Sequence, residues 1–112
     1  MKTSAILALA SVLIAPSAAV AETWKNVAVV DTLCLNDVKA DPDKHTKDCA
    51  LECVAGGYGI ILTDGTFLKF DKPGNEKAVA AIKASTREDH LRATVVGERS
   101  GDTLKVTSIT IE

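Results

Sequence analysis

Apolar residues recur in short runs or alternate with polar ones after residue 22, and this pattern predicts short strands. The run 27–35 (VAVVDTLCL) is rich in β-branched residues and predicts a strand that ends near Cys34. In 58–70 (YGIILTDGTFLKF), two apolar runs flank Asp64-Gly65, a dipeptide typical of tight hairpins in which both central residues take positive φ. Residues 91–112 predict two further strands joined by a turn at 100–102, with a β-bulge where the alternation changes phase at Thr107-Ser108.

Two stretches have helical spacing. Residues 49–55 (CALECVA) predict a short helix, with Thr46 or Asp48 as its N-cap and Gly56-Gly57 as its end. Residues 75–85 (NEKAVAAIKAS) predict a second helix that Asn75 caps and that has one apolar face.

The predicted order is strand, short helix, strand, strand, helix, strand, strand. Five short strands with a helix between the third and the fourth is the order of an OB-fold, a five-stranded Greek-key barrel. We therefore expect a mainly β protein, an OB-fold-like barrel with the short cysteine-bearing helix after strand 1. An α+β sandwich of the same elements is the alternative.

The first 21 residues, MKTSAILALASVLIAPSAAVA, have the layout of a secretory signal peptide. A lysine near the start precedes an apolar run, and Ala19-Val20-Ala21 forms a small-x-small cleavage site. As a membrane anchor the apolar run is too short, because Pro16 interrupts it before the roughly 20 residues that a spanning helix needs. We expect export to the periplasm or medium, cleavage of residues 1–21, no membrane contact afterwards, and a single domain over 22–112.

Charge and motifs narrow the function classes. The chain has 13 basic and 15 acidic side chains, so removal of Lys2 with the signal peptide leaves a net charge of −3. This charge and the few aromatic residues give no reason to expect a nucleic-acid partner. Since the chain also lacks a nucleophile elbow, a phosphate loop and an HExxH motif, we expect a binding protein that is not an enzyme.

A histidine and two cysteines at steps of four give the strongest chemical signal. If 45–53 (HTKDCALEC) is helical, His45, Cys49 and Cys53 project from nearly one face, and the loop after Cys34 can return that cysteine to it. Three thiols and an imidazole suit tetrahedral Zn²⁺, and thiolates also suit Cu(I). The sequence therefore predicts a zinc or copper site with Cys34, His45, Cys49 and Cys53 as ligands.

A disulfide is the competing interpretation of the same cysteines. Cys49 and Cys53 are poorly spaced on a helix to bond each other, but either can bond Cys34. Closing a loop of about 16–20 residues would contribute roughly 3 kcal/mol to a small domain. The protein would then be a disulfide-stabilised module that binds a small ligand or a protein without a metal. Asp31, three residues before Cys34, is expected to hold the loop by hydrogen bonds.

The combined pattern resembles a group of small exported bacterial proteins whose function is largely unassigned. The resemblance rests on D-x-x-C at 31–34, H-x₃-C-x₃-C at 45–53, a glycine-tyrosine step, the D-G hairpin and the final pair of strands. It covers nearly all of residues 22–112 and implies an OB-like fold in which Asp31, Cys34, His45, Cys49 and Cys53 belong together. It implies no substrate and no reaction.

Overall fold

A computed structural model describes residues 20–112, so the predicted signal peptide lies almost entirely outside the described residues. The strands are β1 (Glu22–Asp31), β2 (Tyr58–Ile61), β3 (Phe67–Phe70), β4 (Arg92–Ser100) and β5 (Thr103–Ile111). The helices are α1 (Leu35–Val38), α2 (Lys47–Glu52) and α3 (Lys72–Ala84), with 3₁₀ turns at Pro42–Lys44 and Val54–Gly56.

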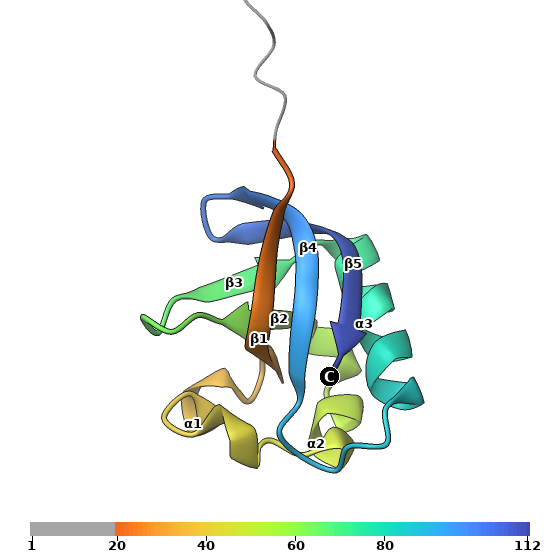
Figure 1. The fold of residues 1–112 in the computed structure, drawn as a ribbon. Helices are drawn as coiled ribbons and strands as arrows, with labels where there is room; N and C mark the ends of the chain where they lie inside the picture. Colours follow the sequence, from red (N-terminus) through yellow and green to blue (C-terminus); the bar gives the residue numbers. More distant parts are fainter. Residues whose placement is uncertain (1–19) are drawn as a thin grey trace, which may run out of the picture.

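The five strands form one sheet in the order β1-β2-β3-β5-β4 (Figure 1). Strand β4 also pairs with β1, so the pairing returns to its starting strand. All pairs are antiparallel except that of β3 with β5. The prediction of a mainly β fold with five strands, a short helical insertion after β1 and a helix between β3 and β4 is confirmed.

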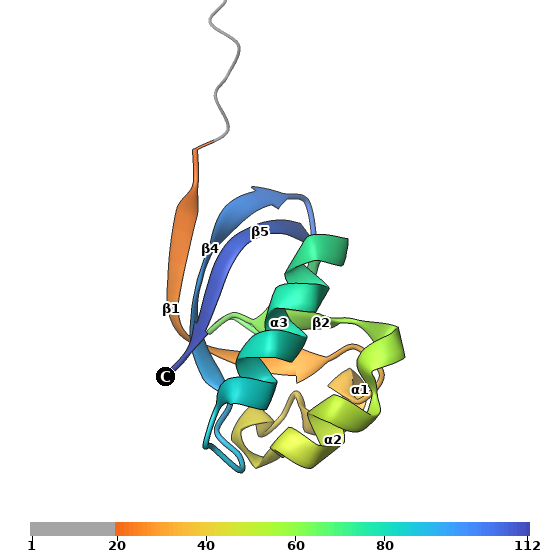
Figure 2. The ribbon, with the colours of Figure 1, turned by 90° about the vertical axis from the view of Figure 1, so that its right-hand side faces the viewer.

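The core lies between the sheet and α3, which runs beside β5 (Figure 2). Ala78 and Ile82 are the buried apolar side chains of α3 and stand one turn apart, as the helical spacing predicts. From the sheet, alternate residues of β4 and β5 point inward. The largest fully buried side chains of the core are Tyr58, Ile60, Leu68, Ile82, Leu91 and Leu104.

Helix α3 begins earlier than predicted. Its N-cap is Asp71, whose Oδ1 accepts hydrogen bonds from Gly74 N at 3.0 Å and from Val106 N at 3.2 Å. Pro73 fits the first turn for two reasons: its fixed φ is helical, and an N–H group in the first turn would have no acceptor within the helix, so its absence costs no hydrogen bond. Asn75 is therefore not the cap, and its Oδ1 instead accepts a hydrogen bond from Tyr58 N at 2.8 Å.

The two predicted turns are present, one in a different form. Only Gly65 of the pair Asp64-Gly65 has positive φ, at 88°. Gly65 N donates to Leu62 O and Leu62 N donates to Thr66 O, which makes a three-residue loop with glycine in its last position. The expectation of positive φ at both residues was wrong, because the extra loop residue lets Asp64 keep an ordinary φ. In the β4–β5 hairpin the register shifts opposite Thr107, so the predicted bulge is confirmed.

The segment 31–57, which carries α1 and α2, lies at the lower end of the sheet in both views (Figures 1 and 2). Within this segment, all of which the structure describes, Ala50 is the only buried apolar side chain. This segment therefore buries little apolar surface completely, and the candidate site lies here.

Candidate metal centre

Asp31 ends β1 and is fully buried. It pairs with Tyr58 in the β1–β2 ladder, and its carboxylate lies beyond the last apolar residues of the strand. Asp31 Oδ1 accepts a hydrogen bond from Cys34 N at 2.9 Å, which fixes the turn that leads into α1. The expected role of Asp31 in holding the loop is thus seen as this hydrogen bond.

His45 is the second buried side chain that can carry a charge, at 2% exposure. Its Nε2 lies 2.7 Å from Asp31 Oδ2. Neither atom makes a hydrogen bond of good angular geometry with the described residues, although both are buried. At 2.7 Å the two atoms form a close polar pair, and this pairing offsets part of the cost of burying them.

His45 precedes α2 and does not lie on it. The backbone of His45 is extended after the 3₁₀ turn at Pro42–Lys44, and α2 starts at Lys47. Thr46 is the N-cap, as one alternative predicted, and its Oγ1 accepts a hydrogen bond from Cys49 N at 3.1 Å. The assumption of one continuous helix over 45–53 was wrong because this cap starts the helix after His45 and the helix ends before Cys53.

Cys34 and Cys53 converge on Asp31. The sulfur atoms of both cysteines and one carboxylate oxygen of Asp31 all lie within 4.8 Å of one another. Cys34 stands in the turn before α1, and Cys53 stands immediately after the last residue of α2. Two loop ends therefore bring two sulfur atoms to a strand-end carboxylate.

Cys49 lies apart from this group. Its side chain is on α2 and exposed, whereas Cys34 and Cys53 are partly buried. Of the four predicted ligands, the structure brings Cys34 and Cys53 together and places His45 against Asp31. The sequence analysis did not include Asp31 among the ligands, although its position three residues before Cys34 was the signal for it.

The charges of the site act on its thiol and phenol groups. Partial burial, the Asp31 carboxylate and a hydrogen bond with Cys53 raise the pKa of Cys34 to about 12, so its thiol is protonated at neutral pH. Burial, and then the charges of Asp31 and Cys53, raise the pKa of Tyr58 to about 12. The neutral Tyr58 hydroxyl donates a hydrogen bond to Ala50 O, which ties α2 to the sheet.

This donor set suits a thiophilic metal ion. Zn²⁺ accepts thiolate, imidazole and carboxylate ligands in tetrahedral sites. A cation among these groups would offset the repulsion between the Asp31 carboxylate and two thiolates. Asp31, Cys34 and Cys53 are the residues that could hold such an ion directly. His45 contacts Asp31 but is not among the residues whose ligand atoms all lie within 4.8 Å of one another.

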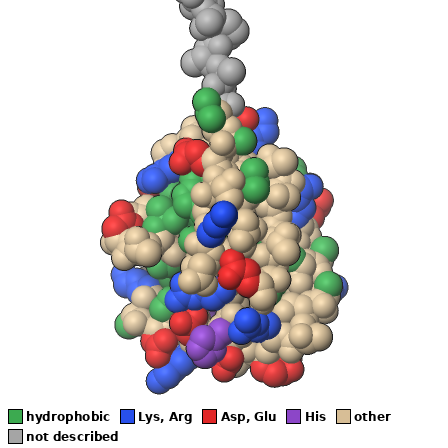
Figure 3. All heavy atoms as spheres, in the orientation of Figure 1, with side chains coloured by type: hydrophobic (Ala, Val, Ile, Leu, Met, Phe, Trp, Pro, Cys, Tyr) green, Lys and Arg blue, Asp and Glu red, His purple; other side chains and the backbone are tan. Residues whose placement is uncertain are grey.

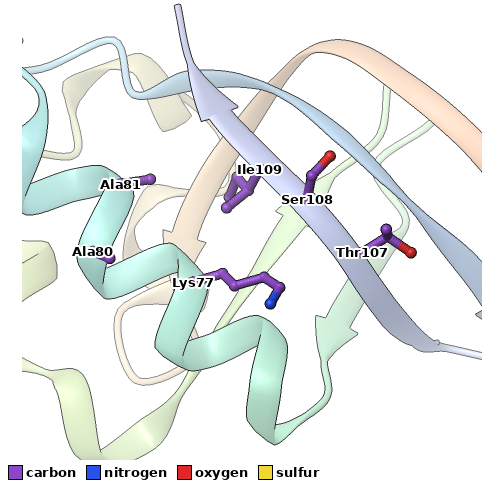
Figure 4. A pocket seen from close by; sticks show the side chains of 6 residues that line it. All are labelled: Lys77, Ala80, Ala81, Thr107, Ser108 and Ile109. Carbon is purple, nitrogen blue, oxygen red and sulfur yellow. The ribbon is translucent and has the colours of Figure 1, made fainter.

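Other surface features have weaker chemistry. A groove of about 460 Å³ lies between α3 and β5 (Figure 4). Its lining has a single ionisable side chain and consists of Lys77, Ala80, Ala81, Thr107, Ser108 and Ile109. On the face in Figure 3, acidic and basic side chains mix around a histidine. Among the exposed groups, His90 Nδ1 lies 2.8 Å from Asp89 Oδ1. Neither feature combines burial with several donors.

Among residues 20–112, no helix has the length and apolar character required to cross a membrane. Comparison of the chain with protein-family models, curated proteins and solved structures gave no match.

Proposed function

We propose that this chain is an exported, non-catalytic protein that binds zinc or copper(I) through Asp31, Cys34 and Cys53, with His45 as the fourth donor. The observation that carries the proposal is the approach of two sulfur atoms and a buried carboxylate oxygen to within 4.8 Å of one another. Compared with the ligand set drawn from the sequence, Asp31 replaces Cys49.

The composition of the Asp31–Gly57 segment supports the same proposal. A segment with Ala50 as its one buried apolar side chain gains little from hydrophobic burial. Small domains of this kind often depend on a metal or a disulfide as a cross-link. An ion held by Asp31, Cys34 and Cys53 would join the end of β1 to the end of α2.

The strand order supports an OB-fold-like barrel as the scaffold. The meander β1-β2-β3, the parallel pair of β3 with β5 and the return of β4 to β1 agree with that class. Export is part of the proposal and rests on the signal-peptide pattern of residues 1–21.

A disulfide-stabilised module without metal is the second candidate function. The observation that favours it is again the proximity of the Cys34 and Cys53 sulfur atoms. Cys49 would then be the remaining thiol, exposed on α2. This candidate predicts a protein that is isolated with one free thiol and no metal.

Metal titration of the reduced protein tests the proposal. We expect one Zn²⁺ or Cu⁺ per chain by native mass spectrometry, with competition against a chromophoric chelator giving the affinity. Asp31→Asn, Cys34→Ser and Cys53→Ser should each weaken binding by at least about tenfold, and His45→Ala should weaken binding while the far-UV circular dichroism is kept.

Cys49→Ser is the matched control, because it removes a thiol that lies outside the group. We expect its metal affinity to equal that of the wild type. Absence of binding to the reduced wild type, or equal losses in Cys49→Ser and Cys53→Ser, would contradict the proposed site.

A further inference from the structure

We infer that metal binding and a Cys34–Cys53 disulfide are mutually exclusive states of this site, so that thiol oxidation releases the metal. The inference rests on the proposed function and adds that thiol oxidation regulates metal binding. Both states need the same two sulfur atoms, which already lie within 4.8 Å of each other. A sulfur atom joined to another in a disulfide is no longer the thiolate that a metal ion requires.

The positions of the two cysteines allow this conversion. A disulfide requires the sulfur atoms to approach to about 2.05 Å. Cys34 precedes α1, and Cys53 follows α2, where its φ of −109° and ψ of 32° depart from helical values. Since neither residue belongs to a strand, the bond can form by adjustment at two loop ends without disturbing the pairing of the sheet.

Accessibility also separates the sulfur atoms from the other donors. Cys34 and Cys53 are partly exposed, whereas Asp31 and His45 are buried. We therefore expect a small disulfide in solution to approach the site from the side of these two cysteines. After oxidation the site would retain a carboxylate and an imidazole, 2.7 Å apart, but no thiolate ligand.

The chemistry balances as a thiol–disulfide exchange. One cysteine thiolate, formed by loss of its proton to solvent or already bound to zinc, attacks a low-molecular-weight disulfide and releases one small thiolate, which takes a proton from solvent. The second cysteine then attacks the mixed disulfide in the same way and releases the other small thiolate, which is also protonated. The two cysteine sulfur atoms are oxidised, the small disulfide is reduced to two thiols, and a bound Zn²⁺ leaves with its charge unchanged. A small thiol in excess, or a stronger reductant, reverses the process.

The experiment uses the Cys49→Ser variant, which keeps both site cysteines and removes the exposed thiol. The reduced protein is loaded with one equivalent of Zn²⁺ and treated with oxidised glutathione. Released zinc is followed with 4-(2-pyridylazo)resorcinol while mass spectrometry follows the loss of two hydrogens. We expect one zinc released per disulfide formed, recovery of binding after reduction, and oxidation at least about tenfold slower with zinc than without it.

The possible failures are distinguishable. Zinc that stays bound after the disulfide has formed, equal oxidation rates with and without zinc, or accumulation of glutathione adducts without a Cys34–Cys53 bond would each overturn the exclusion while leaving the metal site intact. A reduced protein that binds no zinc and no Cu⁺ would overturn the proposed function itself. Cys34→Ser in the Cys49→Ser background has one thiol and should release no zinc coupled to an intramolecular disulfide.

Discussion

The region formed by α3, β4 and β5 and the segment Asp31–Gly57 are built in different ways. In the first, side chains such as Ile82, Val95 and Leu104 are fully buried and apolar. In the second, the buried side chains are those of Asp31, His45 and Ala50. The first region is held by packing of apolar surface, whereas the second buries little apolar surface and contains a buried polar pair, Asp31 and His45.

This difference explains how a small domain can support a polar cluster. Burying a carboxylate costs free energy unless it is paired, so such a group persists only where the surrounding structure is stable without it. The sheet and α3 provide that stability. Tyr58 and Asp31, opposite each other in the β1–β2 ladder, connect the two regions.

Of the changes that test this comparison, metal addition should have the largest effect on the free energy of unfolding. At free Zn²⁺ about 1,000 times the dissociation constant, ligand linkage should raise the free energy of unfolding by about 4 kcal/mol. The measurement is urea unfolding of the reduced protein with zinc and with a chelator. The increase should be absent in Cys53→Ser and present in Cys49→Ser. An equal increase in Cys53→Ser would mean that zinc stabilises the protein at another place.

A cavity in the packed region should give the second largest effect. It should lower the free energy of unfolding by an amount that does not depend on metal. Leu104 is fully buried in β5, and its replacement by alanine should lower the free energy of unfolding by about 3 kcal/mol. The same urea experiment should give this loss with zinc and with chelator, because Leu104 lies in the apolar core and is no part of the proposed metal site. A loss that changed strongly with zinc would show that the two regions are coupled more closely than we infer.

Removal of the Tyr58 hydroxyl tests the connection between the regions. Tyr58→Phe keeps the ring in the core but leaves Ala50 O without its donor, which should cost about 1–2 kcal/mol. We also expect the substitution to accelerate amide hydrogen exchange more in α2 than in β4, each relative to the wild type. Uniform acceleration along the chain would contradict a local role for this hydrogen bond.

The packed region could be predicted from the sequence because its signals are local and periodic. Leu104 and Val106 alternate inward as expected, and the change of phase at Thr107 is the observed bulge. The cap of α3 was missed because Asp71, Pro73 and Asn75 all suit a helix start. The choice of Asp71 depends also on its hydrogen bond to Val106 N, a contact distant in sequence.

The candidate site was predictable only in part. The spacing identified Cys34 and Cys53, but the alignment of His45 with Cys49 assumed a single helix that the Thr46 cap interrupts. The approach of His45 to Asp31 depends on a loop between residues far apart in sequence, and helical periodicity carries no information about such a contact. The resemblance to small exported proteins did include Asp31, and its membership in a common motif with the cysteines stays a prediction.

The ion pair between Asp43 and Arg92 gives the smallest expected effect and joins the segment to β4. Arg92 Nε and Nη2 donate to the two carboxylate oxygens of Asp43 at 2.8 and 3.0 Å. These hydrogen bonds lower the pKa of Asp43 below its usual value. A depressed carboxyl pKa stabilises the folded protein above the unfolded pKa of about 3.9, and the contribution is lost as the pH falls through the folded value.

Asp43→Asn should therefore lower the free energy of unfolding by about 1 kcal/mol at pH 7, and the difference from the wild type should shrink as the pH falls below about 4. Asp41→Asn is the matched control, since Asp41 is more exposed and lies 3.6 Å from Lys44 in a surface pair. The control should change the unfolding free energy by less than about 0.5 kcal/mol. Denaturant unfolding at pH 7 and at pH 3, with chelator present, measures both variants. A difference for Asp43→Asn that was as large at pH 3 as at pH 7 would mean that its carboxylate charge does not hold the segment to β4, and that the shape of the side chain does.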